Sequence, residues 1–337
     1  MKRRSRLRKR DILVILTVVL LVLTGLFLAA RWLDDENANP EPSGDYRLRY
    51  ETDRVVFNGH TYRKRNNLST ILFMGIDREA ETGEVPAYLE YLSGGQADFL
   101  RLLVIDHAEK TIAQIEIDRD TMTPITMLGA TGSKLGYRTA QICLSHSFGD
   151  GKEQSCGFTA EAVSTLLLNV PIDYYAAMNL DGISTVNDMV GGVTVTLLDD
   201  FSHIDPTMTK GTTLTLQGDQ AEIFVRSRMS MSVGTNEARM ARQQQYVSRM
   251  MELLNSKIHG SVDFIGTLFD ELSPYLCTNM TRAHMVNEAW AVKDYTRLPV
   301  ASIGGVHEYG EDGYMQFLPD ADSLEQIVLD TFYKQLK

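Results

Sequence analysis

Cysteine is scarce in this sequence of 337 residues, and several motifs that identify common enzyme classes are missing. Three cysteines without any C-x-x-C spacing argue against a disulfide-rich scaffold and against a structural zinc site. There is no G-x-x-x-x-G-K-S/T segment to hold ATP on a P-loop, and no G-x-S-x-G segment to mark a hydrolase serine.

Positive charge is concentrated in the first ten residues, and the rest of the chain is acidic. The formal net charge is −11, and residues 1–10 hold seven Lys or Arg without any acidic residue. Residues 11–337 therefore carry the balance, −18. General nucleic-acid binding needs a basic face, so an acidic body of this kind argues against a nucleic-acid partner.

Residues 12–30 form one long apolar run directly behind the basic tip. The run contains no charged residue, and as a helix it would be roughly 28 Å long, close to the thickness of a membrane's hydrocarbon core. Arg31 and Trp32 follow in place of a small-residue cleavage site, which favours an uncleaved anchor over the alternative of a signal peptide. We therefore expect a cytoplasmic tip at 1–11, a single transmembrane helix at 12–32 in the cell membrane, and an extracellular remainder.

The exported part is expected to begin with a polar stalk at 33–66 and to continue as one domain at 67–337. Within the stalk, residues 54–63 are typical of a small hairpin that turns at Asn58 and Gly59.

Export affects the interpretation of the cysteines, because disulfides form outside the cell. Three cysteines permit one disulfide. A bond between Cys143 and Cys156 across their short polar loop is one interpretation, and free thiols are the other.

Strand and helix patterns are mixed throughout the expected domain. Residues 69–77 form an apolar run that ends at Asp77, as expected of a buried strand, and residues 99–118 indicate two strands around a turn at 106–110. Further strands are expected at 172–180 and 193–200. Helices are expected from about Thr139, at 158–169 with Thr159 as N-cap, at 182–192 and at 323–336. Residues 218–256 are expected to form two helical pieces separated by a loop at 229–236. This mixture predicts an α/β fold class with three layers.

Charged residues appear at the ends of these strands, where the apolar pattern predicts none. Asp77 and Arg78 close one strand, Asp98 precedes the next, and Arg119 with Asp120 closes another. Because ligands gather outside the carboxyl ends of strands in open α/β sheets, the arrangement indicates a binding site. For each residue taken alone, a turn-capping carboxylate or a surface ion pair is the alternative.

A second group of charges lies in a short basic stretch further along the acidic chain. Arg226 and Arg228 share a face if the chain is extended, and Arg239 and Arg242 share one face of a helix. Guanidinium groups bind phosphate oxygens in pairs, so a phosphate ligand is one interpretation and a solvated helix face is the other. Carboxylates and arginines at one site together indicate a diphosphate with a divalent cation.

Several segments of the domain form recognisable motifs. They are ILFMGIDR (71–78), GGQADFLRLLVID (94–106), IEIDRDT (115–121), KLGYRTA (134–140), VPIDYYAAMNLDGISTVNDMVGGVTV (170–195), LQGDQAEIFVRSRM (216–229) and NEARMARQQQ (236–245). In this order, over a motif core at 67–256, they resemble the LytR–CpsA–Psr family of membrane-anchored cell-wall proteins. The basic tip, the membrane helix and the exported domain fit the same family.

The resemblance implies a phosphotransferase with an α/β/α sandwich fold. Such proteins move a glycopolymer, such as a teichoic acid or a capsular or secondary wall polysaccharide, from a polyprenyl-diphosphate carrier to the 6-hydroxyl of N-acetylmuramic acid in peptidoglycan, with formation of a phosphodiester. A hydrophobic groove for the polyprenyl chain is expected between strands 69–76 and 99–105 and helix 159–168. The expected partners are therefore the membrane, the polyprenyl-linked glycopolymer and peptidoglycan.

The resemblance also implies roles for individual residues. The implied catalytic residues are Asp77, Arg119, Asp120, Arg226 and Arg228, of which the arginines also contact the diphosphate. The other implied diphosphate-binding residues are Arg78, Arg239, Arg242, Gln243 and Lys134. Arg239, Arg242 and Gln243 either contact the phosphates directly or support the residues that do. Asp77 and Asp98 correspond to the carboxylates that hold Mg²⁺, or Mn²⁺ in its place. Asp120 is expected to orient Arg119, and Asp77 to accept the proton of the sugar hydroxyl.

The chain departs from the family pattern at two positions and in one loop. Gln96 stands where the family commonly has Arg, and Asn236 where it commonly has Asp; a lost charge-assisted hydrogen bond costs roughly 1.5–3 kcal/mol of binding. Arg101 lies inside an apolar strand, either at its edge with the head in solvent or turned inward by a bulge to replace the missing cation. Segment 78–95 makes one loop longer and more acidic.

These departures motivate an alternative function: a catalytically weakened, membrane-anchored protein that binds or regulates polyprenyl-linked glycans. A polyprenyl-diphosphate hydrolase without acceptor specificity is a third possibility.

Overall fold

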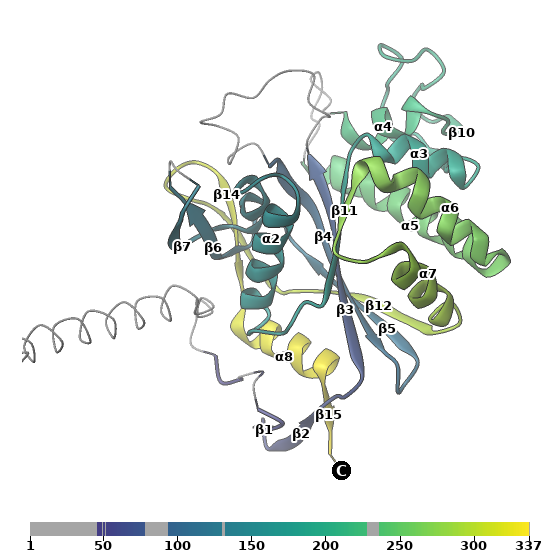
Figure 1. Ribbon diagram of the computed structural model, residues 1–337. Helices are drawn as coiled ribbons and strands as arrows, with labels where there is room; N and C mark the ends of the chain where they lie inside the picture. Colours follow the sequence, from purple (N-terminus) through teal and green to yellow (C-terminus); the bar gives the residue numbers. More distant parts are fainter. Residues whose placement is uncertain are drawn as a thin grey trace, which may run out of the picture. The chain divides into compact units, whose positions relative to one another are not determined.

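A computed structural model provides the structure of the protein. It describes residues 46–48, 50, 52–77, 94–129, 132–227 and 236–336 (Figure 1). The chain divides into two units, residues 1–40 and 41–337, and the described residues all belong to the second. Within the described ranges, no helix is long and apolar enough to span a bilayer; the helix expected at 12–32 lies outside them.

A six-stranded sheet forms the centre of the domain, in the order β11-β8-β3-β4-β5-β12 (Figure 1). Its strands are β3 (Leu68–Asp77), β4 (Gln96–Asp106), β5 (Thr111–Ile117), β8 (Tyr174–Asn179), β11 (Leu276–Thr278) and β12 (Thr296–Ser302). Strands β3, β4 and β5 pair antiparallel, whereas β8 runs parallel to β3 and β12 runs parallel to β5. The strands expected at 69–77, 99–118 and 172–180 are thereby confirmed.

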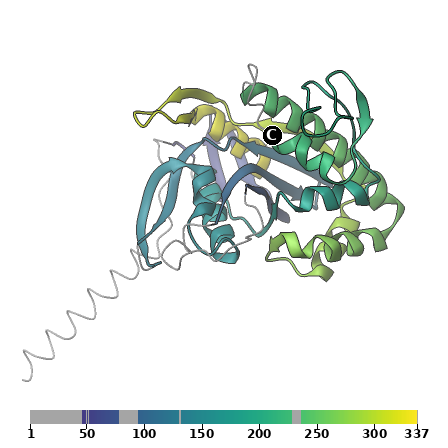
Figure 2. The same cartoon turned by 90° about the horizontal axis from the view of Figure 1, so that it is seen from above.

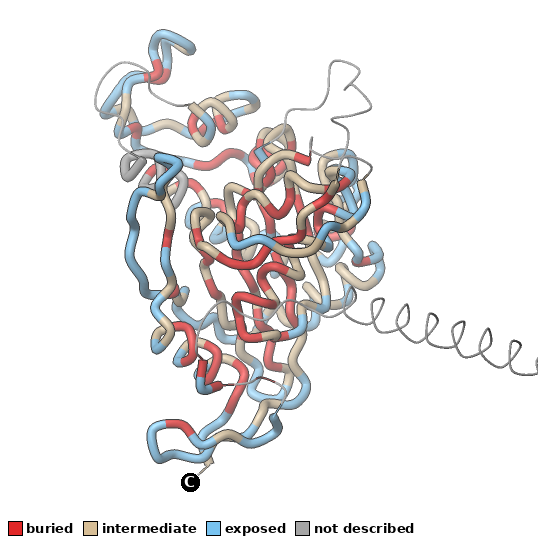
Figure 3. Tube along the Cα trace, turned by 90° about the vertical axis from the view of Figure 1, so that its left-hand side faces the viewer, coloured by how far each residue is buried: buried red, intermediate tan, exposed pale blue. Residues whose placement is uncertain are grey.

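Helices cover both faces of this sheet, which gives three layers. On one face, α2 (Glu153–Leu166) and α8 (Ala321–Phe332) pack on the main core, which includes Leu72, Leu100 and Leu102. On the other face, Ile71 and Ile105 belong to a smaller cluster with residues from α7 (Arg282–Ala291) packed against it. Alternate residues of β3 and β4 therefore enter different cores, as the period of a strand requires. Figure 3 shows buried residues concentrated along the strands and the helices beside them.

Four further helices surround a core of their own at one side of the sheet (Figure 2). They are α3 (Gly182–Met189), α4 (Asp219–Arg226), α5 (Asn236–Gly260) and α6 (Val262–Leu272). Their core includes Val186, Phe224 and Tyr246, together with Val195 of the short strand β9 (Thr194–Thr196), which pairs with β10 (Thr213–Thr215). The two helical pieces expected within 218–256 are confirmed as α4 and α5.

The N-terminal part of the described chain packs against its C-terminal end. Strands β1 (Arg54–Phe57) and β2 (His60–Lys64) form the expected hairpin, and its turn residues Asn58 and Gly59 have φ values of 49° and 79°. Two positive φ values are typical of the tight turn that this residue pair favours. Strand β15 (Tyr333–Gln335) then pairs with β2.

Residues before the hairpin also enter the main core. Tyr46, Leu48 and Tyr50 are buried there, and the backbone N–H of Leu48 donates to the carboxylate of Glu325 on α8 at 2.8 Å. Part of the segment expected as a stalk at 33–66 thus belongs to the folded domain, because its apolar side chains find partners on α8.

Two expected helices differ in the structure. Residues 134–141 form strand β7 (Lys134–Gln141), which pairs with β6 (Met122–Leu128), so the helix expected from about Thr139 is replaced by a strand and a short 3-10 turn, η2 (Ile142–Ser147). Helix α2 begins at Glu153, and Thr159, the expected N-cap, is buried within it and donates its hydroxyl to the carbonyl of Ser155 at 3.0 Å.

The remaining differences concern the ends of elements. The strand expected at 193–200 is limited to β9, and the last helix ends at Phe332, where the chain becomes β15. The other elements are η3 (Ser273–Tyr275), β13 (Gly305–Tyr309) and β14 (Met315–Pro319).

Candidate active site

A bulge in β4 brings the charged residues of the first motifs to one end of the sheet. Asp77, the last residue of β3, lies opposite Gln96, the first residue of β4. Ile76 pairs with Ala97 and Gly75 pairs with Phe99, so Asp98 is an extra residue without a partner in β3. Such a bulge re-aims the neighbouring side chains.

Arg119 lies at the centre of this group. Its guanidinium forms an ion pair with Asp98 and donates a hydrogen bond of 2.6 Å to Oε1 of Gln96. Asp120 is a more distant partner, with Oδ1 at 3.5 Å from Nε of Arg119. Asp120 thus contacts Arg119, but Asp98 and Gln96 hold the guanidinium more closely. That Asp120 orients Arg119 remains a prediction.

The turn that carries Arg119 is fixed by its own hydrogen bonds. The carboxylate of Asp118 accepts from the backbone N–H of Asp120 at 2.8 Å, and the carbonyl of Asp118 accepts from the hydroxyl of Thr121 at 2.7 Å. The backbone N–H of Cys143 in η2 donates to the carbonyl of Arg119 at 3.1 Å. The sequence Asp-Arg-Asp-Thr therefore forms a turn that presents Arg119 in a defined direction.

Cys143 adds a thiol to this group that the sequence did not point to. Its Sγ lies 3.5 Å from Nη2 of Arg119. Burial raises the pKa of Cys143 to about 11, although the charge of Arg119 acts in the opposite direction. Burial also opposes the charge of Arg119, but its contacts with Cys143, Asp98 and Asp120 outweigh that effect and raise its pKa. At neutral pH, the site therefore holds a protonated arginine and a neutral thiol.

The contacts of Cys143 also rule out the disulfide considered for it. Cys143, Cys156 and Cys277 are all free; Cys156 on α2 lies 3.6 Å from Nε2 of His146 and also interacts with Cys277 on β11. A Cys143–Cys156 bond is therefore not formed; one thiol faces Arg119, whereas the other faces the third cysteine.

Arg242 is buried and does not present its guanidinium to a ligand. Only 2% of its surface is exposed, and it donates to the backbone carbonyls of Phe224 at 2.6 Å and Ser227 at 2.5 Å. It also forms an ion pair of 2.6 Å with Asp199. Of the two roles that the resemblance implies for Arg242, direct contact with phosphate or support of residues that contact it, these contacts fit the second, because Arg242 holds the end of α4.

Arg226, the last residue of α4, is partly exposed and forms an ion pair with Glu222 at 3.1 Å, one helical turn earlier. Arg78 and Arg228 lie outside the described residues, as do the side chains of Arg239 and Gln243. Their expected contacts with a diphosphate remain predictions.

Lys134 belongs to a different cluster. Its Nζ donates to the hydroxyl of Tyr137 at 2.6 Å and lies 3.4 Å from the carboxylate of Glu161 on α2. Tyr137 donates to the same carboxylate at 2.7 Å, and burial together with this bond raises the pKa of Tyr137. The structure therefore places Lys134 between β7 and α2, in contact with residues other than those around Arg119.

Asp77 and Asp98 are suitable for a divalent cation. They are hard oxygen donors on neighbouring strands, and Asp77 is exposed at the end of β3. Among the described residues, no group of three or more His, Cys, Asp or Glu is arranged to enclose a metal. Mg²⁺ rarely needs such a group, because it usually takes one or two carboxylates and completes its shell with phosphate and water.

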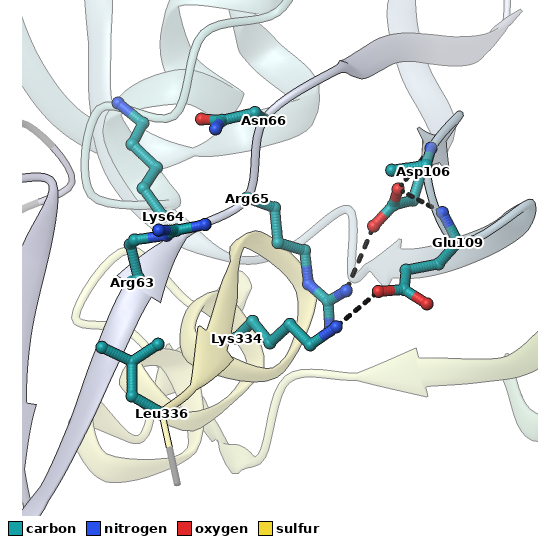
Figure 4. Close-up of a pocket in the computed structure, with 9 residues that line it drawn as sticks. Arg63, Lys64, Arg65, Asn66, Asp106, Glu109, Lys334 and Leu336 are labelled. Carbon is teal, nitrogen blue, oxygen red and sulfur yellow. Dashed lines mark hydrogen bonds and ion pairs between the residues drawn. The ribbon is translucent and has the colours of Figure 1, made fainter.

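A cavity of about 220 Å³ lies at the opposite end of β4, beside the β4–β5 turn (Figure 4). It is lined mainly by charged residues from β2, this turn and β15: Arg63, Lys64, Arg65, Asn66, Asp106, Ala108, Glu109, Lys334 and Leu336. Arg65 pairs with Asp106 at 3.1 Å, and Lys334 pairs with Glu109 at 2.6 Å. These two pairs engage both acidic residues of the wall, and Arg63 and Lys64 are its other two cations. We take the group around Arg119 as the candidate active site, because it holds the charged residues of the strand-end motifs.

The fold and the charged strand ends together define a protein of the LytR–CpsA–Psr class. The LytR_cpsA_psr family matches residues 39–331, and the chain belongs to this family.

Two curated relatives are similar to the chain over much of its length. A polyisoprenyl-teichoic acid–peptidoglycan teichoic acid transferase, TagV of Bacillus subtilis (strain 168), is 27% identical over 77% of this chain and 62% of the relative. TagU of Halalkalibacterium halodurans, named for the same activity, is 28% identical over 63% of this chain and 60% of the relative. The chain thus spans less than two thirds of the length of either.

Solved structures are similar in fold. The crystal structure of B. subtilis TagV has a TM-score of 0.56 at 25% identity, covering 80% of this chain and 96% of that one. The protein gbs0355 of Streptococcus agalactiae has a TM-score of 0.61 at 19% identity, covering 80% and 91%.

Proposed function

We propose that this protein is a phosphotransferase that moves a glycopolymer of the teichoic acid type from a polyprenyl-diphosphate carrier to peptidoglycan. The observation that carries the proposal is the arrangement of Arg119, held by Asp98 and Gln96 beside the end of β3. Family membership and the activity named for the relatives support it. The basic tip and the apolar run at 12–30 support a place in the cell membrane with the domain outside the cell.

In this proposal, catalysis rests on positioning and charge. Arg119 enters the reaction already oriented, so its guanidinium stabilises the charge of a bound phosphate without reorganisation. The exposed carboxylate of Asp77 accepts the proton of the attacking sugar hydroxyl. Mg²⁺ or Mn²⁺ held by Asp77 and Asp98 would supply further neutralisation of the diphosphate charge. No covalent protein intermediate is needed, and the neutral thiol of Cys143 is not used as a nucleophile.

A second candidate function is a membrane-anchored protein that binds polyprenyl-linked glycans and transfers them poorly. Gln96 favours it, because a neutral amide occupies a position next to Arg119 where the family commonly has a cation.

The full-length protein in detergent, with a synthetic polyprenyl-diphosphate glycan and Mg²⁺, distinguishes these functions. The wild type is expected to release polyprenyl phosphate and to label a peptidoglycan acceptor, whereas Asp77→Ala and Arg119→Ala are expected to lose both products. Binding of the lipid without either product would refute the transferase and support the binding protein. Release of polyprenyl phosphate without labelling would instead identify a hydrolase.

A further inference from the structure

Arg101 is a buried cation on the same face of the sheet as Asp77. In an uninterrupted strand, Gln96 and Arg101 would point to opposite faces, because they are five residues apart. The bulge at Asp98 changes this alternation: Gln96 lies opposite Asp77, and Arg101 lies opposite Phe73, four residues before Asp77 on the same face of β3.

The guanidinium of Arg101 lacks the hydrogen bonds that a buried charge requires. Only 7% of the residue is exposed, and its Nε and Nη2 have no hydrogen-bond partner in the described part of the chain. Glu116 lies 3.4 Å from Nη2, but its side chain is 40% exposed, so this ion pair compensates little of the cost of burial. Buried donors in folded proteins are nearly always satisfied, which makes two unsatisfied ones an indication of a ligand.

The guanidinium of Arg101 lies beside Phe99 and across from Glu116 on β5. Its guanidinium carbon lies 5.1 Å from the centre of the Phe99 ring, and Phe99 is closer than Arg101 to the site end of β4. The partner of Phe99 is Gly75, two residues from Asp77, which corresponds to roughly 7 Å along the strand. Phe99 packs over Gly75, where an added Cβ would lie 3.1 Å from Cβ of Phe99, and Phe73, on the same face, is 37% exposed to solvent.

We propose that Arg101 binds a phosphate oxygen of the donor's diphosphate and replaces the cation that Gln96 does not supply. This inference rests on the proposed function, because it takes the donor to be a diphosphate. Arg101, from β4, and Arg119, from the turn after β5, then both contribute a guanidinium group to the diphosphate site.

Binding of inorganic pyrophosphate to the full-length protein in detergent, with Mg²⁺ present, tests the inference by calorimetry. Arg101→Met is expected to weaken pyrophosphate binding about 10- to 100-fold. Glu116→Gln is the matched control, since it removes the same ion pair and is expected to leave the affinity within threefold of the wild type. Thermal unfolding verifies that both variants are folded, and Arg101→Lys provides a milder variant if Arg101→Met unfolds.

A rescue separates binding from structural support. The double variant Gln96→Arg, Arg101→Met is expected to regain most of the lost affinity, because a cation returns to the same face of β4. Equal affinities of wild type and Arg101→Met, equal losses in Arg101→Met and Glu116→Gln, or a wild type that does not bind pyrophosphate would each overturn the inference. A wild type that binds pyrophosphate through Arg101 but transfers no glycopolymer would leave it intact and refute the proposed function alone.

Discussion

Arg242, near the N-terminal end of the longest described helix, donates a hydrogen bond of 2.6 Å to the backbone carbonyl of Phe224 in the last turn of another helix. Its second bond, to the carbonyl of Ser227, lies just beyond the end of α4. Carbonyls at a helix end have no partner within the helix. Arg242 therefore caps the C-terminal end of α4 from another helix, and it fixes the position of Arg226, the last residue of α4.

Arg242→Met is expected to destabilise the fold and to impair the proposed reaction. Each of the two carbonyls left without a donor costs roughly 1–3 kcal/mol, so the free energy of unfolding should fall by about 2–6 kcal/mol in total. Because the end of α4 loses its anchor, KM for the donor should rise more than kcat falls. Urea unfolding and steady-state kinetics measure the two effects. A variant as stable as the wild type would show that the cap is dispensable.

Arg119→Lys is expected to keep the positive charge but to lose activity. A lysine cannot reach Asp98 and Gln96 with a planar fork, so the cation is displaced and kcat for the proposed transfer should fall about 100-fold. Asp120→Asn is the matched comparison, because Asp120 lies at 3.5 Å and its loss should cost less than about tenfold. Equal effects of the two substitutions would contradict the assigned geometry.

The sequence predicted those parts of the fold that depend on neighbouring residues. Apolar runs located β3, β4 and β5, and Asn58 with Gly59 located the hairpin turn. The prediction of Thr159 as an N-cap was wrong because a threonine hydroxyl can also bond to a carbonyl within a helix, as it does here. Strand β7 was missed because its residues have a mixed pattern and are stabilised by pairing with β6.

In the site, the motifs located Asp77, Asp98 and Arg119, whose surroundings are set by adjacent strands. They did not distinguish Arg242 from its neighbours, because its partners, Asp199 and the carbonyl of Phe224, come from distant parts of the sequence. Long-range contacts of this kind leave no local pattern.

Stability at alkaline pH should depend on Tyr333. Its hydroxyl donates to the carbonyls of Tyr50 at 3.1 Å and Thr52 at 3.2 Å, and burial raises its pKa from 10.0 to about 12. Because the folded state holds this proton more tightly than the unfolded state, the tyrosine stabilises the fold below pH 10. This contribution to the free energy of unfolding, at most about 3 kcal/mol, is lost as the pH rises through 12. Tyr333→Phe should therefore be less stable than the wild type at pH 8, and the difference should shrink by pH 11.5. Urea unfolding across this range tests it, and a constant difference would contradict the assignment.

Oxidation should join Cys156 to Cys277. The hydrogen bond between these thiols raises the pKa of Cys156 and lowers that of Cys277, so Cys277 is the thiol that ionises first. With oxidised glutathione at pH 8, the Cys277 thiolate attacks the disulfide and releases one glutathione. Cys156 then displaces the second, so that one glutathione disulfide is reduced to two thiols as the protein bond forms.

Peptide mass mapping should find this cross-link, and the free energy of unfolding should rise by about 2–4 kcal/mol, because the bond closes a long loop in the unfolded chain. Cys143→Ser should not change the result, since Cys143 faces Arg119, whereas Cys156→Ser should abolish the cross-link. Recovery of a Cys143–Cys156 peptide would show instead that α2 and η2 rearrange before oxidation. It would also show that the contact between Arg119 and Cys143 is too weak to keep the two thiols apart.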